Sequence, residues 1–305
     1  MRRIMSGSPT NPKHEGTRLN ALSFDVEDYF QVSAFADVVD RTRWSEHPLR
    51  VGANTRRLLE ILAERDVKAT FYVLGWVAER VPELVREIAA AGHEVASHGY
   101  SHQLIYRQSP QVFREETRRS KGVLEHLIQQ PVSSYRAASY SITRGSLWAL
   151  DILYEEGFTQ DSSIFPIRHD RYGLMGGPLQ PHYLELRNGG RLLEFPISTL
   201  RIHGVSLPVS GGGYFRLYPY ALSRLLARRV NADNRPFVFY LHPWEVDPDQ
   251  PRVDVGVFTR FRHYNNLDRC RSRLERLLRD FRFGTVSQSV AANYPDAAAL
   301  PVHRY

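Results

Sequence analysis

The sequence predicts an α/β protein built as a distorted (β/α) barrel of about seven strand–helix units. Short apolar runs, typical of buried strands, alternate with longer stretches whose apolar residues recur at helical spacing. This alternation is typical of a parallel sheet in which each crossover between strands contains a helix. Because about seven such units fit into the 305 residues, a closed or nearly closed barrel is favoured over an open sheet.

The predicted strands are short apolar runs, several of which end in charged or polar residues. They lie at residues 21–24, 68–74, 93–97, 132–136, 192–198, 236–243 and 283–287. The predicted helices carry apolar residues on one face, and they lie at residues 53–66, 81–92, 109–129, 144–157 and 267–281. The third helix has a clear start, because Ser109 is a good N-cap and Pro110 suits the first helical position.

We expect a single domain at residues 19–290, with a flexible lead-in at 1–18 and a C-terminal tail at 291–305. The lead-in is rich in Ser, Pro, Asn and Gly, as flexible termini often are. The segment 162–215 breaks the strand–helix rhythm and is rich in Gly, Pro, Tyr and His. We expect this segment to be an inserted loop region over the functional site, not a second domain.

Composition narrows the class of protein. The chain is 42% hydrophobic and 24% charged, which is ordinary for a soluble globular protein. Its single cysteine, Cys270, cannot form an internal disulfide. The N-terminal residues lack the apolar core of a secretory signal, and no stretch offers the roughly 20 apolar residues of a membrane span. We therefore expect a cytoplasmic protein.

The net charge is compatible with several classes of binding partner. A net charge of +7 can suit nucleic acid, an anionic membrane surface or an acidic polymer. The arginines are scattered over the predicted helices, and no nucleic-acid-binding signature accompanies them. We therefore expect no nucleic-acid partner, while peripheral association with the inner membrane and the oligomeric state stay open.

Two histidines follow the predicted strand at 93–97. His98 and His102 are four residues apart in "SHGYSH", and a helical turn after His98 would put both imidazoles on one face. Two histidines and a carboxylate are a common ligand set for a catalytic divalent metal. An isolated pair at this spacing often binds nothing, so the interpretation depends on a third ligand.

Three carboxylates at the end of the first strand could supply that ligand. Asp25, Glu27 and Asp28 lie within four positions, and crowded carboxylates repel one another unless a cation or an arginine is present. Strand alternation puts Glu27 on the same side as Asp25, whereas Asp28 has the shorter side chain. A helix cap or a solvated turn is the alternative interpretation of this stretch.

Further candidates lie at the ends of later strands, where chemistry is found in parallel α/β barrels. Arg136 could orient a carboxylate and lower its pKa, or form an ordinary ion pair. Asp161 ends the fifth unit. His242 follows the apolar run "FVFYL" and could donate a proton, or be a hydrogen-bonded core histidine. Trp244 is a candidate for a wall of the pocket.

The motifs "FDVED", "HGYSH", "YRAASY", "DSS" and "LHP" occur in this order. In this respect the chain resembles the polysaccharide deacetylases of carbohydrate esterase family 4, which share the NodB homology domain and its distorted barrel. The resemblance covers roughly residues 20–290. Within that family, "DVEDYF", "FPIRHDRYG" and "LHPWE" look like the subgroup found in bacterial exopolysaccharide loci beside the exosortase/PEP-CTERM system.

The resemblance implies a metal-dependent hydrolase that removes N-acetyl groups from amino sugars, so it acts on a carbon–nitrogen bond other than a peptide bond. It implies a divalent ion, with Zn²⁺ the first choice, bound by His98, His102 and one carboxylate. The usual first motif has two adjacent aspartates, whereas here Val26 follows Asp25. On residue type we prefer Asp28 over Glu27 as the metal carboxylate. Association with exopolysaccharide synthesis machinery is a further possibility that the resemblance raises.

The resemblance also implies catalytic roles. Asp25 would be the base that takes a proton from water, and Arg136 would hold it ionised. A backbone N–H near Tyr140 would stabilise the oxyanion. His242 would protonate the leaving amine, and Asp161 would hold His242 charged.

Two alternatives remain at this stage. One keeps the metal site but changes the substrate to another amide or a cyclic ureide. The other is a non-catalytic relative that binds glycan. The second is disfavoured because the chain retains Asp25, both histidines, Arg136 and His242.

Overall fold

The computed structural model describes residues 18–169 and 172–305. One ten-stranded sheet runs through this part of the chain in the order β10–β1–β2–β3–β4–β5–β7–β6–β12, and β11 also pairs with β1. The parallel strands of its main run are β1 (Leu19–Val26), β2 (Thr70–Val73), β3 (Glu94–Ser97), β4 (Ser134–Tyr135), β5 (Gln160–Asp161), β7 (Arg191–Glu194) and β10 (Val238–Leu241).

The remaining strands lie at the margins of the sheet. Strand β11 (Arg282–Gly284) runs parallel to the first half of β1. Strand β6 (His182–Glu185) is antiparallel to β7, and β12 (Val302–His303) is parallel to β6. A separate antiparallel hairpin is formed by β8 (Thr199–Ile202) and β9 (Val205–Pro208).

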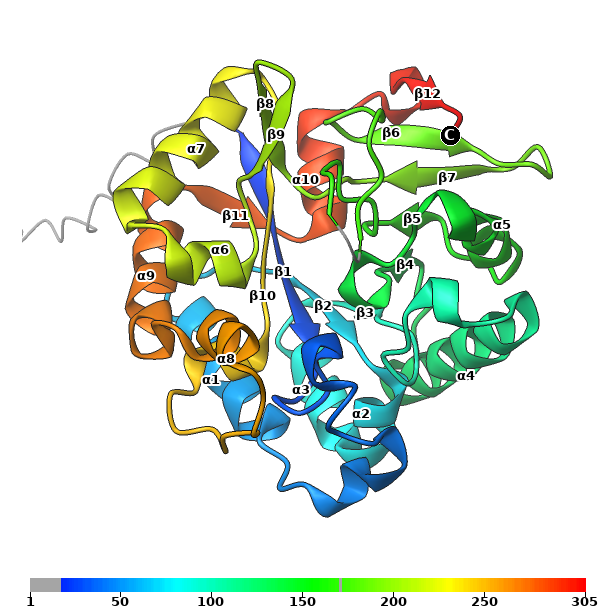
Figure 1. Ribbon diagram of the computed structural model, residues 1–305. Coiled ribbons are helices and arrows are strands. Elements are labelled where there is room, and N and C mark those ends of the chain that lie inside the picture. The colour runs from blue at the N-terminus through cyan, green and yellow to red at the C-terminus, as the bar shows by residue number, and fades with distance from the viewer. Residues whose placement is uncertain (1–17, 170–171) are drawn as a thin grey trace, which may run out of the picture.

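The helices surround the sheet, as Figure 1 shows. The α-helices are α1 (Val51–Ala63), α2 (Gly75–Arg80), α3 (Pro82–Ala90), α4 (Pro110–Ile128), α5 (Trp148–Glu155), α6 (Gly212–Leu217), α7 (Tyr220–Ala232), α8 (Val257–Tyr264), α9 (Leu267–Asp280) and α10 (Val286–Asn293). Short 3-10 helices are η1 (Ser33–Phe35), η2 (Arg41–Glu46), η3 (Ile105–Arg107), η4 (Ala138–Tyr140), η5 (Arg144–Ser146), η6 (Pro243–Val246) and η7 (Ala297–Ala299). No helix among the described residues is both long and apolar enough to cross a membrane.

The sheet is strongly curved, but its hydrogen-bond ladder does not close within the described residues. An inner cluster packs side chains from strands far apart in the ladder, such as Tyr72 of β2, Leu193 of β7 and Val238 of β10. The backbone N–H of Val238 also donates to Ser198 Oγ, beyond β7, at 2.8 Å. The α/β class and the parallel sheet are confirmed, while closure of the barrel stays a prediction.

Most predicted elements are found close to their expected positions. The start of α4 is confirmed, because Ser109 Oγ accepts a hydrogen bond from the Val112 N–H. The strand predicted at 283–287 is wrong beyond Gly284. Thr285 caps a helix there, its hydroxyl accepting from the Gln288 N–H while the Gln288 side chain accepts from the Thr285 N–H.

The second half of the chain is richer in structure than the sequence indicated. The segment 162–215 contains β6–β9 and the start of α6, so part of the inserted region joins the main sheet. The segment 291–305, expected as a tail, holds η7 and β12. The predicted lead-in at 1–18 lies outside the described residues except for Arg18.

Candidate metal centre and active site

The candidate residues gather because parallel strands end at one edge of the sheet. Strands β10, β1, β2, β3 and β4 are consecutive neighbours. Glu27 follows β1, His98 follows β3, Arg136 follows β4 and His242 follows β10. The carboxyl ends of parallel strands face the same side of the sheet, so these side chains meet in one region.

Glu27, His98 and His102 form the candidate metal centre. One possible ligand atom from each lies within 4.8 Å of the other two, and all three side chains are buried. Glu27 Oε2 is 2.7 Å from His102 Nε2. His98 Nδ1 lies 2.8 Å from the Arg136 carbonyl oxygen, which leaves Nε2 as the atom that can bind an ion. A backbone carbonyl on the other ring nitrogen is the usual support of a metal-binding histidine.

The donor set fits a divalent ion. His102 Nδ1 is buried without a hydrogen-bond partner among the described residues, which is costly for a polar atom unless another group satisfies it. Burial lowers the pKa of His98 to about 4, so its imidazole is neutral and able to ligate. Burial raises the pKa of Glu27, but His102, His242 and His98 together outweigh burial and bring it to about 2, so the carboxylate is ionised.

A left-handed turn, and not a helical one, brings the two histidines together. His102 has a φ of 52° and Gly99 a φ of 75°, a region that side chains other than Gly rarely adopt. The imidazole centroids of His98 and His102 are 5.3 Å apart. Uncommon backbone geometry of this kind is found where function requires a side chain to be aimed.

Asp28 is not part of this centre. Its Oδ2 accepts hydrogen bonds from the backbone N–H groups of Arg50 and Val51, at 2.7 and 2.9 Å. Its Oδ1 accepts from the Tyr29 N–H. Oδ2 therefore holds the start of α1, and Oδ1 holds the turn after β1. The structure groups Glu27, and not the preferred Asp28, with the two histidines.

Asp25 is held by an arginine in the centre of the sheet. Arg136 Nη1 donates to Asp25 Oδ1 at 2.7 Å and to Ser23 Oγ at 2.8 Å. The Arg136 Nε and Nη2 groups donate to the backbone and side chain of Ser162. Arg136 is fully buried and its guanidinium lies 4.0 Å from the Tyr72 ring centroid. Its orientation is therefore fixed on every side, and so is that of Asp25.

The other oxygen of Asp25 faces Tyr140 and His242. Asp25 Oδ2 lies 3.5 Å from the Tyr140 hydroxyl and 3.9 Å from His242 Nε2. His242 Nε2 is also 3.7 Å from Glu27 Oε1. Thus the candidate base, the candidate acid and the candidate metal carboxylate share one small volume.

His242 is oriented by Glu245, not by Asp161. His242 Nδ1 lies 2.8 Å from Glu245 Oε1, and Arg216 Nε donates to Glu245 Oε2 at 2.7 Å. Burial lowers the pKa of His242, but Glu245, Glu27 and Asp25 together raise it to about 9. His242 is therefore protonated at neutral pH and can donate a proton.

Asp161 lies in a separate buried carboxyl pair. It accepts hydrogen bonds from the side chain and backbone of Ser163, at 2.6 and 3.2 Å, and bonds to the side chain of Glu194. Burial raises the pKa of Asp161, and burial together with the Asp161 charge raises that of Glu194. Both directions favour the protonated form of a carboxyl group, and neither group is among the residues that raise the pKa of His242.

Tyr140 and Trp244 both reach the site. The Tyr140 N–H donates to the Ala137 carbonyl at 3.0 Å, so only its hydroxyl faces Asp25. Trp244 stacks on His242 with ring centroids 5.1 Å apart, and its Nε1–H donates to Glu27 Oε1 at 3.2 Å. Trp244 is thus both a wall and a support of the metal carboxylate.

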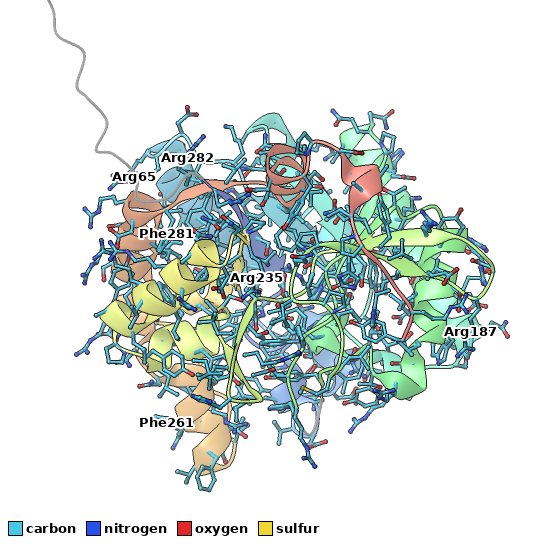
Figure 2. The ribbon with its side chains drawn as sticks, turned by 90° about the horizontal axis from the view of Figure 1, so that it is seen from above. Arg65, Arg187, Arg235, Phe261, Phe281 and Arg282 are labelled. Carbon is cyan, nitrogen blue, oxygen red and sulfur yellow. The ribbon has the colours of Figure 1, made fainter. Side chains whose placement is uncertain are left out.

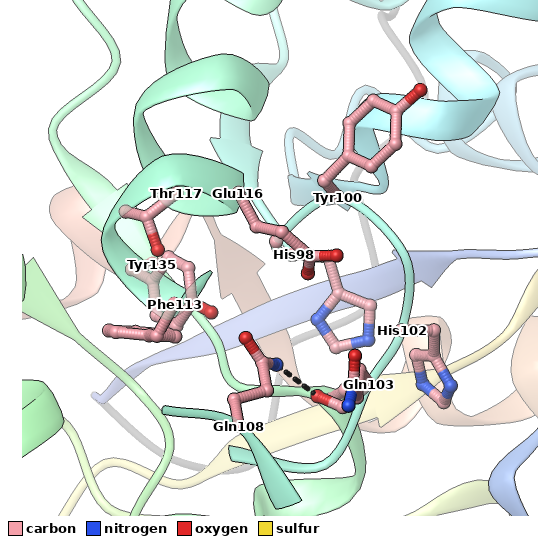
Figure 3. A pocket seen from close by; sticks show the side chains of 11 residues that line it. His98, Tyr100, His102, Gln103, Gln108, Phe113, Glu116, Thr117 and Tyr135 are labelled. Atoms are coloured by element: carbon pink, nitrogen blue, oxygen red, sulfur yellow. Dashed lines mark hydrogen bonds between the residues drawn. The ribbon is translucent and has the colours of Figure 1, made fainter. Parts of the chain in front are cut away.

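A small pocket lies behind the histidines. Figure 3 shows His98 and His102 on the loop after β3, with Glu116 and Thr117 of α4 also lining the pocket. Its volume is only about 10 Å³, which is at the lower limit for one water molecule. It is a packing gap and not a substrate site.

A larger open groove lies beside the site. Its volume is about 510 Å³, and it is lined from the loops that follow β3, β4 and β5, including Tyr106, Arg144 and Tyr172. Tyr172 lies 6.4 Å from Tyr140, measured between ring centroids, so the groove adjoins the residues around Asp25. A groove of this size falls within the range of ligand sites.

The fold and the site together define a class: a parallel α/β protein with a buried two-histidine, one-carboxylate centre at the carboxyl ends of its strands. Residues 43–153 match the family model described as polysaccharide deacetylase. Residues 162–291 match a second family, described as a domain of unknown function (DUF3473).

Individual relatives match part of the chain or share its fold. The chain is 31% identical over 99 residues to a chitooligosaccharide deacetylase from Bradyrhizobium sp. (strain ANU 289), covering 32% of this chain and 43% of that protein. It thus matches less than half of the length of that relative. The crystal structure of a putative polysaccharide deacetylase from Mycobacterium smegmatis has the same fold, with a TM-score of 0.61 and 22% identity over 99% and 98% of the two chains.

The fold is also shared with the crystal structure of Puue allantoinase, with a TM-score of 0.59, 15% identity and coverage of 97% and 98%. Likeness at this identity concerns the fold alone. The fold is therefore common to proteins with different named activities.

Proposed function

We propose that this protein is a metal-dependent deacetylase that hydrolyses the N-acetyl groups of amino sugars in a bacterial exopolysaccharide or its precursor. One observation carries the proposal. The buried carboxylate of Asp25 lies between Arg136 and His242, and the Glu27–His98–His102 cluster adjoins it. A base, an acid and a metal centre in contact are what hydrolysis of an amide requires.

Glu27, His98 and His102 would hold the divalent ion, and Zn²⁺ suits a set of two imidazoles and one carboxylate. When bound, such an ion supplies Lewis acidity toward a carbonyl oxygen and toward water. Trp244, through its bond to Glu27, and the Arg136 carbonyl, through its bond to His98, would keep the ligands oriented.

The chain's own residues then divide the proton transfers between them. Asp25 accepts the proton of the attacking water at Oδ2, the oxygen that Arg136 leaves open. Arg136 holds the Asp25 carboxylate in place for that step. His242, protonated at neutral pH, gives its Nε2 proton to the nitrogen of the departing amine. Glu245 fixes the orientation of the His242 ring before and after His242 gives up its proton, and it fixes the tautomer of the neutral ring.

A glycan chain is favoured over a small closed-pocket substrate by the groove next to Tyr140. It is open, it is lined by aromatic and arginine side chains, and it adjoins the site. The exopolysaccharide context and the subgroup found beside the exosortase system are proposed from "DVEDYF", "FPIRHDRYG" and "LHPWE" alone. We also retain the proposal of one domain across residues 19–290.

The test measures metal content and acetate release on the same purified protein. We expect about one divalent ion per chain, and acetate release from chitooligosaccharides and poly-N-acetylglucosamine that a chelator abolishes and Zn²⁺ restores. The Asp25→Asn variant should keep its metal and lose about 10²- to 10⁴-fold in turnover.

Other outcomes would redirect the proposal. Metal without acetate release, together with ammonia or ureide products from cyclic ureides, would favour the alternative amide hydrolase. Absence of metal after reconstitution, with glycan binding retained, would favour a non-catalytic relative. Normal turnover by Asp25→Asn would remove Asp25 from the role of base.

A further inference from the structure

Helix α8 (Val257–Tyr264) exposes three large apolar side chains. Val257 is 79% exposed, Phe258 86% and Phe261 55%. Phe261 lies on a helix that stands out from the rest of the molecule (Figure 2). Single exposed apolar residues are common, but three on one projecting turn form a patch that is typical of an interaction surface.

The patch is bordered by positive charge. At about 100° per residue, Val257, Phe258 and Phe261 fall on one arc of the helix, and Arg260 and Arg262 fall on its two sides. Both arginines are exposed, and neither forms an ion pair with a described residue. No acidic residue lies within the helix itself.

The opposite side of α8 is firmly anchored. His263 is buried, stacks on Trp244 with ring centroids 4.1 Å apart, and bonds through Nε2 to Gln250 Oε1 at 2.8 Å. The His263 carbonyl accepts from Arg216 Nη1 at 2.9 Å. The buried side of the helix is therefore held against Trp244 beside the site. Its apolar residues face away from the protein.

We propose that α8 docks this protein onto an anionic phospholipid bilayer. A short amphipathic helix with aromatic residues on one side and arginines at its flanks is the pattern of an interfacial membrane contact. The net charge of +7 adds to the attraction. A second copy of the chain fits less well, because three apolar side chains are few beside the 20–30 residues per partner of a standard protein interface. The proposal does not depend on the proposed deacetylase activity.

The test is co-sedimentation of the full chain with vesicles. We expect binding to phosphatidylglycerol/phosphatidylethanolamine vesicles, and weaker binding to pure phosphatidylcholine or in high salt. Phe258→Ser/Phe261→Ser should weaken binding by at least about tenfold. Arg260→Gln should weaken it about fivefold on anionic vesicles only. Val112→Ser, an exposed apolar residue on α4 across the molecule, is the control and should bind as the wild type does.

Circular dichroism and turnover of a soluble oligosaccharide should be unchanged in the double phenylalanine variant, because both side chains point to solvent. Light scattering on the same samples measures self-association. Failure of the wild type to sediment with anionic vesicles would overturn the proposal, as would undiminished sedimentation of the double variant. A wild-type dimer that becomes a monomer in the double variant, without vesicle binding, would assign α8 to a contact between copies.

Discussion

The two parts of the active site come from regions of different regularity. The candidate metal part, formed by Glu27, His98 and His102, is built on β1 and β3, where strands and helices alternate regularly. The proton-transfer part joins Asp25 and Arg136, from the same regular region, to His242 and Glu245. These last two follow β10 in a region with extra strands and short helices. One part is positioned by strand ends, the other by a chain of charged side chains.

The side chains of the two parts are held in place in two different ways. His98 is held by a backbone carbonyl, and His102 by a left-handed turn, so the metal part depends on main-chain geometry. His242 is held by Glu245, which Arg216 holds in turn. Substitutions in the first part should therefore change metal content, and those in the second should change turnover at constant metal content.

The largest effect should come from Glu27. Glu27→Ala should lose the metal ion and about 10³-fold in turnover, because several kcal/mol of transition-state stabilisation depend on the ion. Asp28→Ala should keep the metal but lower the free energy of unfolding by about 1 kcal/mol, because it removes the acceptor of the first N–H groups of α1. Metal analysis and chemical denaturation measure the two quantities. Loss of metal in Asp28→Ala with retention in Glu27→Ala would reverse the assignment.

A smaller effect is expected in the proton-transfer part. Glu245→Gln keeps the shape of the side chain but removes the charge beside His242, so kcat should fall about tenfold to hundredfold with metal content unchanged. Asp161→Asn should lower kcat less, because Asp161 bonds to Ser163 and Glu194 and not to His242. Steady-state kinetics of both variants measure the two kcat values. A larger loss in Asp161→Asn than in Glu245→Gln would restore Asp161 as the partner of His242.

The sequence predicted the pair His98 and His102 directly from their spacing, but it left the carboxylate open. Strand alternation put Glu27 on the same side as Asp25, whereas residue type led to the preference for Asp28, which the structure places at the start of α1. Glu245 was overlooked although it lies three residues after His242 in "LHPWE", a spacing that a single short turn brings together. Arg216 could not be predicted to meet Glu245, because 29 residues and a strand separate them.

Helix α8 shows why part of the fold was missed. Its apolar residues face solvent and its buried side is provided by His263, so its hydrophobic pattern is the reverse of that of a core-facing helix. Helix α6 begins within "SGGG", a run that favours a loop. In both places tertiary contacts, which no local pattern reports, decide the structure.

The smallest effect concerns stability at the carboxyl pair of Asp161 and Glu194, which lies next to the strands that hold Arg136. Burial raises the pKa of Glu194, so the folded state binds this proton more tightly than the unfolded chain does. The resulting stabilisation is complete below the ordinary glutamate pKa of about 4.3 and is lost as pH rises toward the folded value. Glu194→Gln stays neutral throughout, so its melting temperature relative to the wild type should rise with pH, by about 2–4 °C per kcal/mol. Glu185→Gln, at an exposed carboxyl on β6 that pairs with Arg304, should show no such rise. Thermal unfolding from pH 4.5 to 8 compares the three proteins. A pH-independent difference for Glu194→Gln would mean that the pair is ionised in the folded state. The positive charge of Arg136, at the centre of the proton-transfer part, would then be neutralised by more carboxylates than Asp25 alone.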